Sequence, residues 1–182
     1  MRAGCSRGSA WPVRIDPHLV SDACLLKDRR LTETGRRAAA MAFEPNIPPI
    51  QVHLCVKGGK AAIAWYERAF GAVETYEQMA EDGVRVLHAN LAMFGSEVML
   101  HDEFPEFMSD VLAPSTRGGA GLTISINVES PAAVDAAFAR AIEAGATSIC
   151  APEDMFWGAR YAKLADPHGH VWGFNAALCP PG

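Results

Sequence analysis

Residues 50–72 form the segment that decides the fold, and they read Ile-Gln-Val-His-Leu-Cys-Val-Lys-Gly-Gly-Lys-Ala-Ala-Ile-Ala-Trp-Tyr-Glu-Arg-Ala-Phe-Gly-Ala. The apolar run 50–56 predicts a buried strand, and the glycine pair that follows it predicts a turn. Residues 61–70 predict a helix, because apolar side chains recur there at helical spacing. Gly71 comes directly after the last turn, where glycine ends many helices.

Three more strands are predicted after this helix, and the same order of elements then returns. The strands of the first series are predicted at 73–79, 84–93 and 97–102. A polar loop rich in proline and glycine leads to a second series, in which Pro131 opens a helix and Gly145 ends it. The strands of this series are predicted at 122–128, near 147–150, at 159–165 and at 170–175.

The repeated order of strand, helix and three strands predicts the fold class. Val56 and Val128 end equivalent strands, and Gly71 and Gly145 end equivalent helices at nearly the same offset. An internal repeat of this kind points to two copies of one structural unit. We expect an α+β fold in which two tandem βαβββ modules form a curved eight-stranded mixed sheet around a shared cavity, the natural place for a ligand.

The chain is predicted to hold one folded domain with two flanking segments. Residues 1–46 show no clear hydrophobic period, so we expect a disordered extension, or a stretch upstream of the true start at Met41. The folded domain spans 47–177, with repeats at about 47–104 and 120–177. Residues 178–182 form a C-terminal tail.

Composition and charge exclude several classes of protein. The net charge of the chain is −5, yet residues 1–40 hold eight basic and four acidic side chains, so the remaining residues carry −9. A general nucleic-acid binder needs a basic face, so no nucleic acid is expected as a partner. No apolar run is long enough for a membrane helix, so no membrane association is expected. Five widely spaced cysteines without a C-x-x-C pair are typical of reduced thiols in the cytoplasm.

Four sequence segments, in this order along the chain, resemble those of the vicinal-oxygen-chelate superfamily, which groups glyoxalases, bleomycin-resistance proteins and dioxygenases. Within that superfamily they are most similar to the PhnB-like branch. They are Ala-Ile-Ala-Trp-Tyr-Glu-Arg-Ala-Phe-Gly-Ala at 62–72, Val-Met-Leu-His-Asp-Glu-Phe-Pro-Glu at 98–106, Phe-Trp-Gly-Ala-Arg-Tyr at 156–161 and Asp-Pro-His-Gly-His-Val-Trp-Gly at 166–173. The resemblance covers about residues 47–177. It implies the doubled module, a ligand cavity between the halves and a homodimer.

The resemblance also implies where a catalytic divalent metal would be held. Enzymes of the superfamily take one His, Glu or Gln ligand from each of four strands, and these positions correspond here to Gln51, Leu100, Thr123 and Gly173. Divalent metals need imidazole or oxygen donors, and among the four only Gln51 has a usable one. We therefore expect no cofactor and no metal ligand. A divalent metal bound through unorthodox ligands, such as His53 and His88 with a carboxylate, remains the alternative. His53 lies two residues after Gln51 and is expected on the same side of the sheet, whereas His101, next to Leu100, is expected on the opposite side.

The function expected from these observations is the binding of a small organic molecule in the cavity between the repeats, without catalytic residues. The alternative is an enzyme, namely a metal-dependent lyase, isomerase or dioxygenase. A third hypothesis is a metal-free enzyme that uses His53 or His101 as a general base. Asp102, Glu103 and Glu106 are expected in a solvated loop or lid. The predicted ligand-binding residues are Gln51, His53, His101, Ser125, Trp157, Arg160, Tyr161 and Trp172.

Overall fold

The structure, a computed structural model, describes residues 50–178. The chain divides into two units, residues 1–47 and 48–182, and all described residues belong to the second. The predicted extension at 1–46 and residues 179–182 of the predicted tail lie outside the described residues. No helix within the described range is long and apolar enough to cross a membrane.

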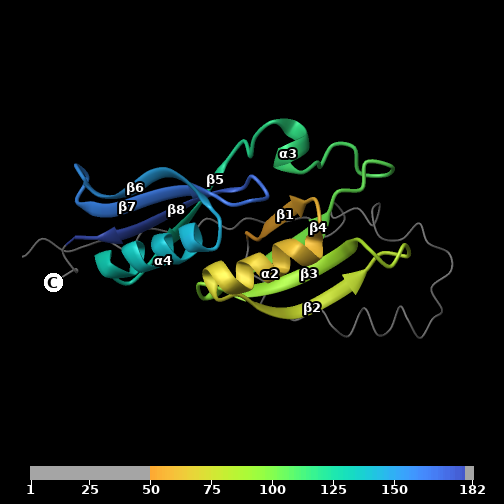
Figure 1. Ribbon diagram of the computed structural model, residues 1–182, viewed down its shortest axis with the longest axis horizontal. Helices are drawn as coiled ribbons and strands as arrows, with labels where there is room; N and C mark the ends of the chain where they lie inside the picture. The colour runs from red at the N-terminus through yellow and green to blue at the C-terminus, as the bar shows by residue number, and fades with distance from the viewer. Residues whose placement is uncertain (1–49, 179–182) are drawn as a thin grey trace, which may run out of the picture. The chain divides into compact units, whose positions relative to one another are not determined.

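Two βαβββ modules follow one another along the chain (Figure 1). The first consists of β1 (Val52–Val56), α2 (Gly59–Phe70), β2 (Val73–Met79), β3 (Val86–Met93) and β4 (Ser96–Asp102). The connecting segment carries the short helix α3 (Pro114–Arg117). The second consists of β5 (Thr123–Asn127), α4 (Pro131–Glu143), β6 (Thr147–Met155), β7 (Ala159–Ala165) and β8 (Val171–Ala177). The predicted α+β fold of tandem modules is confirmed.

The eight strands lie in two four-stranded mixed sheets, with the orders β1-β4-β3-β2 and β5-β8-β7-β6. In each sheet the first and last strands of the module pair in parallel, and the other neighbours are antiparallel. The strands do not hydrogen-bond as one continuous eight-stranded sheet, because other groups lie against the free edge of β1. His170 Nε2 bonds the carbonyl oxygen of Cys55 at 3.0 Å, and α3 also packs on β1.

Strand β6 is longer than the sequence predicts, since it continues past Cys150 to Met155. Pro152 lies inside it, and the pairing with β7 is irregular between Cys150 and Glu153. Proline lacks a backbone N–H, but β6 is an edge strand of its sheet, so no pairing to a neighbour on the outer side is lost.

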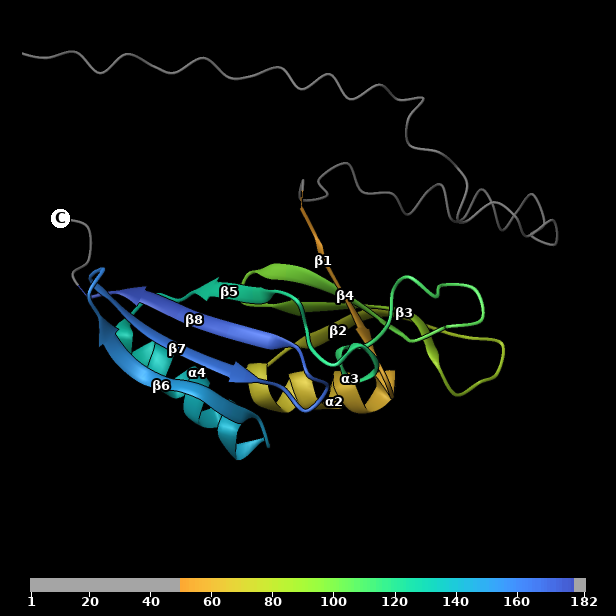
Figure 2. The ribbon, with the colours of Figure 1, turned by 90° about the horizontal axis from the view of Figure 1, so that it is seen from above.

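The two modules meet through helices α2 and α4, which lie next to one another (Figure 2), and through a shared aromatic cluster. Helix α2 packs on α4, and Trp65 Nε1 donates to the carbonyl oxygen of Ala144 at 2.8 Å. Phe70 of α2 lies 5.0 Å from the ring of Trp172 and 5.7 Å from that of Phe174, both on β8. The core is therefore continuous from one module into the other.

A buried carboxylate completes this joint. Asp166, which follows β7 directly, is only 4% exposed and accepts four hydrogen bonds. Tyr66 Oη donates to Oδ2 at 2.6 Å and Trp172 Nε1 at 2.8 Å, while the backbone N–H groups of His168 and His170 donate to Oδ1 at 2.9 Å. Burial, and then the charge of Asp166, raise the pKa of Tyr66 well above its usual value, so the phenol stays a donor.

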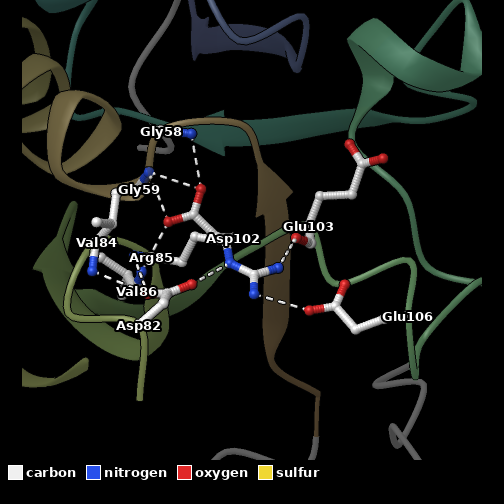
Figure 3. A network of polar contacts seen from close by, with 9 residues as sticks. All are labelled: Gly58, Gly59, Asp82, Val84, Arg85, Val86, Asp102, Glu103 and Glu106. Atoms are coloured by element: carbon white, nitrogen blue, oxygen red, sulfur yellow. Dashed lines mark hydrogen bonds and ion pairs between the residues drawn. The ribbon is translucent and has the colours of Figure 1, made fainter. Parts of the chain in front are cut away.

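A second buried carboxylate fixes the first module and the start of the connecting segment (Figure 3). Asp102 accepts the backbone N–H groups of Gly58 at 2.7 Å, Gly59 at 3.0 Å and Val86 at 2.7 Å, so it holds the N-terminus of α2 against β3. Gly59 is required there, since a Cβ would lie 2.7 Å from Asp102 Oδ2 and from Val86 Cβ. The prediction of a solvated Asp102 is wrong, because the carboxylate is only 3% exposed.

Arg85 ties the same corner to the connecting segment (Figure 3). Its guanidinium bonds Asp82 at 2.6 Å and Glu106 at 2.8 Å, and lies 4.3 Å from the centre of the Phe104 ring. Glu103 accepts the Thr116 hydroxyl at 2.7 Å. Glu103 and Glu106 therefore anchor the connecting segment rather than form a free lid.

We predict that Tyr66→Phe lowers the free energy of unfolding by about 1–3 kcal/mol, because a buried carboxylate oxygen loses a donor. Urea unfolding followed by circular dichroism measures the change. Tyr76→Phe is the matched control: Tyr76 is half exposed, its hydroxyl is 3.4 Å from Gln78, and the same change should cost less than about 0.5 kcal/mol. Equal effects of the two substitutions would contradict the role given to Asp166.

Candidate functional site

Each sheet has one face covered by its helix and one open face, and the strand register decides which side chains lie on which. In β1 and β4, His53 pairs with Met99 and Cys55 with His101, whereas Leu54 pairs with Leu100. Leu54 and Leu100 are buried in the core beneath α2. His53, Met99 and His101 therefore belong to the open face, since side chains alternate along a strand.

Three histidines gather on this open face, from β1, β3 and β4. The ring of His53 lies 4.6 Å from that of His101 and 5.4 Å from that of His88, in edge-on arrangements. His101 Nδ1 bonds the carbonyl oxygen of Asp102 at 2.7 Å, and His88 Nε2 bonds Asn90 Oδ1 at 2.7 Å. Burial, together with the charges of His101 and His88, lowers the pKa of His53 to about 4. His53 is thus neutral at pH 7 and is a poor proton acceptor there.

A pocket of about 530 Å³ lies beside this cluster, between β1, the connecting segment and β5. We call it the seam pocket because it lies where the two modules meet. Its volume is in the range that holds a small organic molecule. It is lined by Gln51, Val52, His53, Leu54, Cys55, Asp110, Val111, Leu112, Pro114, Arg117, Gly119, Ala120, Gly121, Leu122, Ile124 and His170.

Two of the predicted ligand-binding residues, Gln51 and His53, line the seam pocket. A third, His101, packs against the ring of His53 but is not part of the lining. The expectation that His101 faces away from Gln51 and His53 is wrong. It rested on placing the relevant β4 position at Leu100, one residue away from the true register. A shift of one residue along a strand exchanges its two faces.

Two other predicted residues lie on the helix side of the second sheet. Arg160 bonds Asp135 of α4 at 2.6 Å and Asp154 of β6 at 2.9 Å, so its guanidinium is committed to ion pairs. Trp172 is 1% exposed and belongs to the aromatic joint. The prediction that these two residues line the cavity is wrong, because side chains alternate along β7 and β8 and these two point toward α4 and the core.

The remaining predicted residues belong to the open face of the second sheet, outside the lining of the seam pocket. Ser125 pairs with Gly173, and Gly173 pairs with Lys163. Tyr161 lies across Gly173, since a Cβ there would be 2.8 Å from the phenol oxygen. The ring of Trp157, half exposed in the β6–β7 turn, lies 5.9 Å from that of Tyr161. These groups form an aromatic surface separate from the pocket.

The residues at the superfamily's metal positions do not fit a divalent metal. The strand register shows that the β4 position equivalent to Gly173 is Met99 rather than Leu100. Ser125 pairs with Gly173 in the second sheet, and His53 pairs with Met99 in the first. Ser125 and His53 are equivalent, since each lies two residues after a metal position, Thr123 or Gln51. A thioether, a hydroxyl and a glycine are poor donors for a hard cation. The ring of Tyr161 also takes the space that a side chain at 173 needs. Within residues 50–178, no three His, Cys, Asp or Glu side chains are placed to hold a metal ion.

Sequence reasoning missed the part of the pocket that the connecting segment supplies. Val111, Leu112 and Arg117 lie in a stretch without strand or helix periodicity, and their position over β1 depends on the anchors at Glu103 and Glu106. The segment's proline and glycine residues predict a loop, but no sequence signal says against which strand that loop packs.

We predict that Gly173→Ala destabilises the protein by about 1 kcal/mol, because the added methyl group displaces the Tyr161 ring. In a Tyr161→Ala background the same change should be neutral or stabilising, since glycine inside a strand is unfavourable. A thermal-unfolding double-mutant cycle measures the coupling. An identical effect of Gly173→Ala in both backgrounds would show that Tyr161 does not occupy this space.

Comparisons with known proteins agree with the fold and the repeat. Residues 47–174 match the family model described as Glyoxalase/Bleomycin resistance protein/Dioxygenase superfamily. An uncharacterized protein of Mycobacterium bovis is 41% identical over 134 residues, which are 73% of this chain and 84% of that protein.

Solved structures share the architecture. TioX from Micromonospora sp. ML1 is 27% identical, with a TM-score of 0.55 over 71% of this chain and 98% of its own. A PhnB protein from Bacillus cereus is 15% identical, with a TM-score of 0.56 over 71% of this chain and 100% of its own, and this likeness concerns the fold alone. Because the matching family model spans both modules, this chain belongs to the glyoxalase/bleomycin resistance protein/dioxygenase superfamily.

Proposed function

We propose that this protein binds a small organic molecule in the seam pocket and does so without a catalytic metal. The observation that carries the proposal is the pocket itself, about 530 Å³ in volume and lined by aliphatic side chains with a few polar groups. Apolar walls with a small number of placed polar groups are typical of sites for small molecules.

The chemistry of the former metal positions supports the metal-free part of the proposal. The Gln51 amide donates to Glu97 at 3.4 Å, and Gly173 offers no side chain. Three separate replacements would be needed to rebuild a four-ligand site, at Met99, Thr123 and Gly173. The ring of Tyr161 would also have to move. Binding without a metal ion requires none of these changes.

An enzyme is the second candidate, and the histidine cluster is the observation that favours it. His53, His88 and His101 come from three strands and lie in ring contact beside the pocket. Imidazole is the commonest side-chain ligand of transition metals. A metal-dependent lyase, isomerase or dioxygenase that recruits these non-standard ligands would explain the cluster. Its rings would have to rearrange from the edge-on packing found here.

Metal content separates the two candidates. We expect the full chain, expressed without a histidine tag and purified without chelator, to contain less than about a tenth of an equivalent of any transition metal. Plasma mass spectrometry measures this. About one equivalent of zinc, nickel, manganese or iron that disappears in His53→Asn and His88→Asn, but not in His168→Asn, would overturn the metal-free proposal and favour the enzyme.

We also infer a homodimer, located in the cytoplasm. The open faces leave large side chains in water, with Tyr76 50% and Trp157 51% exposed, and a second copy would cover them. The free thiols Cys55 and Cys150 accord with a reducing compartment.

Light scattering after size exclusion should give about twice the chain mass of 19.5 kDa. The double change Tyr76→Ser with Trp157→Ser should shift the protein toward monomer, because it removes apolar area from the contact. Val84→Ser, at a side chain 75% exposed in the β2–β3 turn, is the control and should leave the mass unchanged. A monomeric wild-type protein would contradict the inference.

A further inference from the structure

The ligand class follows from the polar groups of the seam pocket. We propose that the pocket takes a small organic carboxylate with an apolar body, and that the guanidinium of Arg117 binds the carboxylate. This inference rests on the proposed function, which it makes more specific by naming the charge of the ligand and the residue that recognises it.

Arg117 differs from the other arginines of residues 50–178 in its position, and like Arg68 and Arg140 it has no ion pair among the described residues. Arg85 and Arg160 are held in ion pairs, and Arg68 and Arg140 donate to backbone carbonyl oxygens. Arg117 is the arginine that lines the pocket. One of its nitrogens, Nη1, donates to the carbonyl oxygen of Asp110 at 2.9 Å, and within the described residues it has no ion pair.

The bond to Asp110 orients the guanidinium and leaves donors unused. No acceptor among the described residues is recorded for Arg117 Nε or Nη2. A guanidinium presents its N–H groups as a planar fork that matches the two oxygens of a carboxylate, and it keeps its charge at every physiological pH. A ligand carboxylate is therefore the group that completes this side chain.

Backbone donors beside Arg117 add to the same preference. The pocket-lining residues Ala120, Gly121 and Leu122 follow α3, and their N–H groups have no recorded acceptor among the described residues. Gly119 and Gly121 have φ values of 155° and 70°, a backbone path open to glycine. Consecutive free N–H groups in such a path favour negative charge.

At pH 7 the positive charge of the pocket lining is carried by Arg117, because the imidazoles of the lining are neutral. Burial lowers the pKa of His170, and the pKa of His53 is lowered to about 4, so both imidazoles are neutral at pH 7. Burial raises the pKa of Cys55 to about 11, so the thiol keeps its proton. Asp110 is the acidic residue of the lining, and its recorded contact with Arg117 is made by its backbone, not by its carboxylate.

The walls opposite these donors are apolar. Val52, Leu54, Val111, Leu112 and Ile124 supply aliphatic surface from β1, the connecting segment and β5. A hydrocarbon ring system gains free energy when such surface is removed from water. An aromatic or alicyclic carboxylate combines this body with the head group that Arg117 selects.

Two probes of the same shape separate charge from fit: 2-naphthoate and its neutral counterpart 2-naphthamide. Equilibrium dialysis at pH 7 should show the full-length protein binding 2-naphthoate about tenfold more tightly than 2-naphthamide, as expected for hydrogen bonds to a charged group. Arg117→Gln should abolish this preference. Arg68→Gln, an exposed arginine on α2, is the matched control and should keep the preference.

Asp110→Asn gives a test in the opposite direction. Removal of the negative charge of Asp110 should strengthen 2-naphthoate binding relative to 2-naphthamide binding, because that charge repels only the anionic probe. Circular dichroism of each variant confirms that the protein is folded. Equal affinity of the wild-type protein for both probes, or a preference that survives Arg117→Gln, would overturn the carboxylate inference alone. Binding of neither probe would overturn the proposed use of the pocket as well.

Discussion

The buried carboxylate of Asp166 is the group on which the arrangement of the two modules depends. It accepts hydrogen bonds from Tyr66 of the first module, from Trp172 of the second and from two backbone N–H groups of the turn that precedes β8. An isolated buried carboxylate is very unfavourable, and the four donors offset the cost of burying this one. This requirement couples α2 to the β7–β8 turn and gives the joint one geometry.

The pocket is a consequence of that joint. With α2 held on α4 and Phe70 packed on Trp172, the edge strands β1 and β5 both line the pocket and do not hydrogen-bond to each other. His170, at the end of the same turn, reaches the backbone of β1. The connecting segment, anchored by Glu103 and Glu106, then closes over the gap and supplies the apolar wall. A pocket of about 530 Å³ is left where a continuous sheet would have filled the seam.

In this member of the superfamily, the residues at the metal positions do not fit a divalent metal. Where the second sheet would offer a carboxylate, Gly173 makes room for the ring of Tyr161. In the first sheet, Met99 and the pair Gln51–Glu97 lie beside His53, whose imidazole is neutral at pH 7. Arg117, in the segment between the modules, carries the positive charge of the pocket lining instead. In the binding mode that we propose, recognition depends on a loop supported by the two modules, a common arrangement for binding sites.

The sequence by itself determined the modules, because periodicity, helix-ending glycines and the repeated order of elements are local properties of the chain. It also showed that Thr123 and Gly173 are unsuited to a metal ion. Only the tertiary structure decided which side chains share a face or a cavity. The sequence placed the metal position of β4 at Leu100, one residue away from Met99, and so His101 was expected on the wrong face of the sheet. Arg160 and Trp172 contact α4 and the core instead of the cavity. Strand register and the path of an aperiodic segment depend on contacts between residues far apart in the sequence, and those contacts form only when the modules pack together.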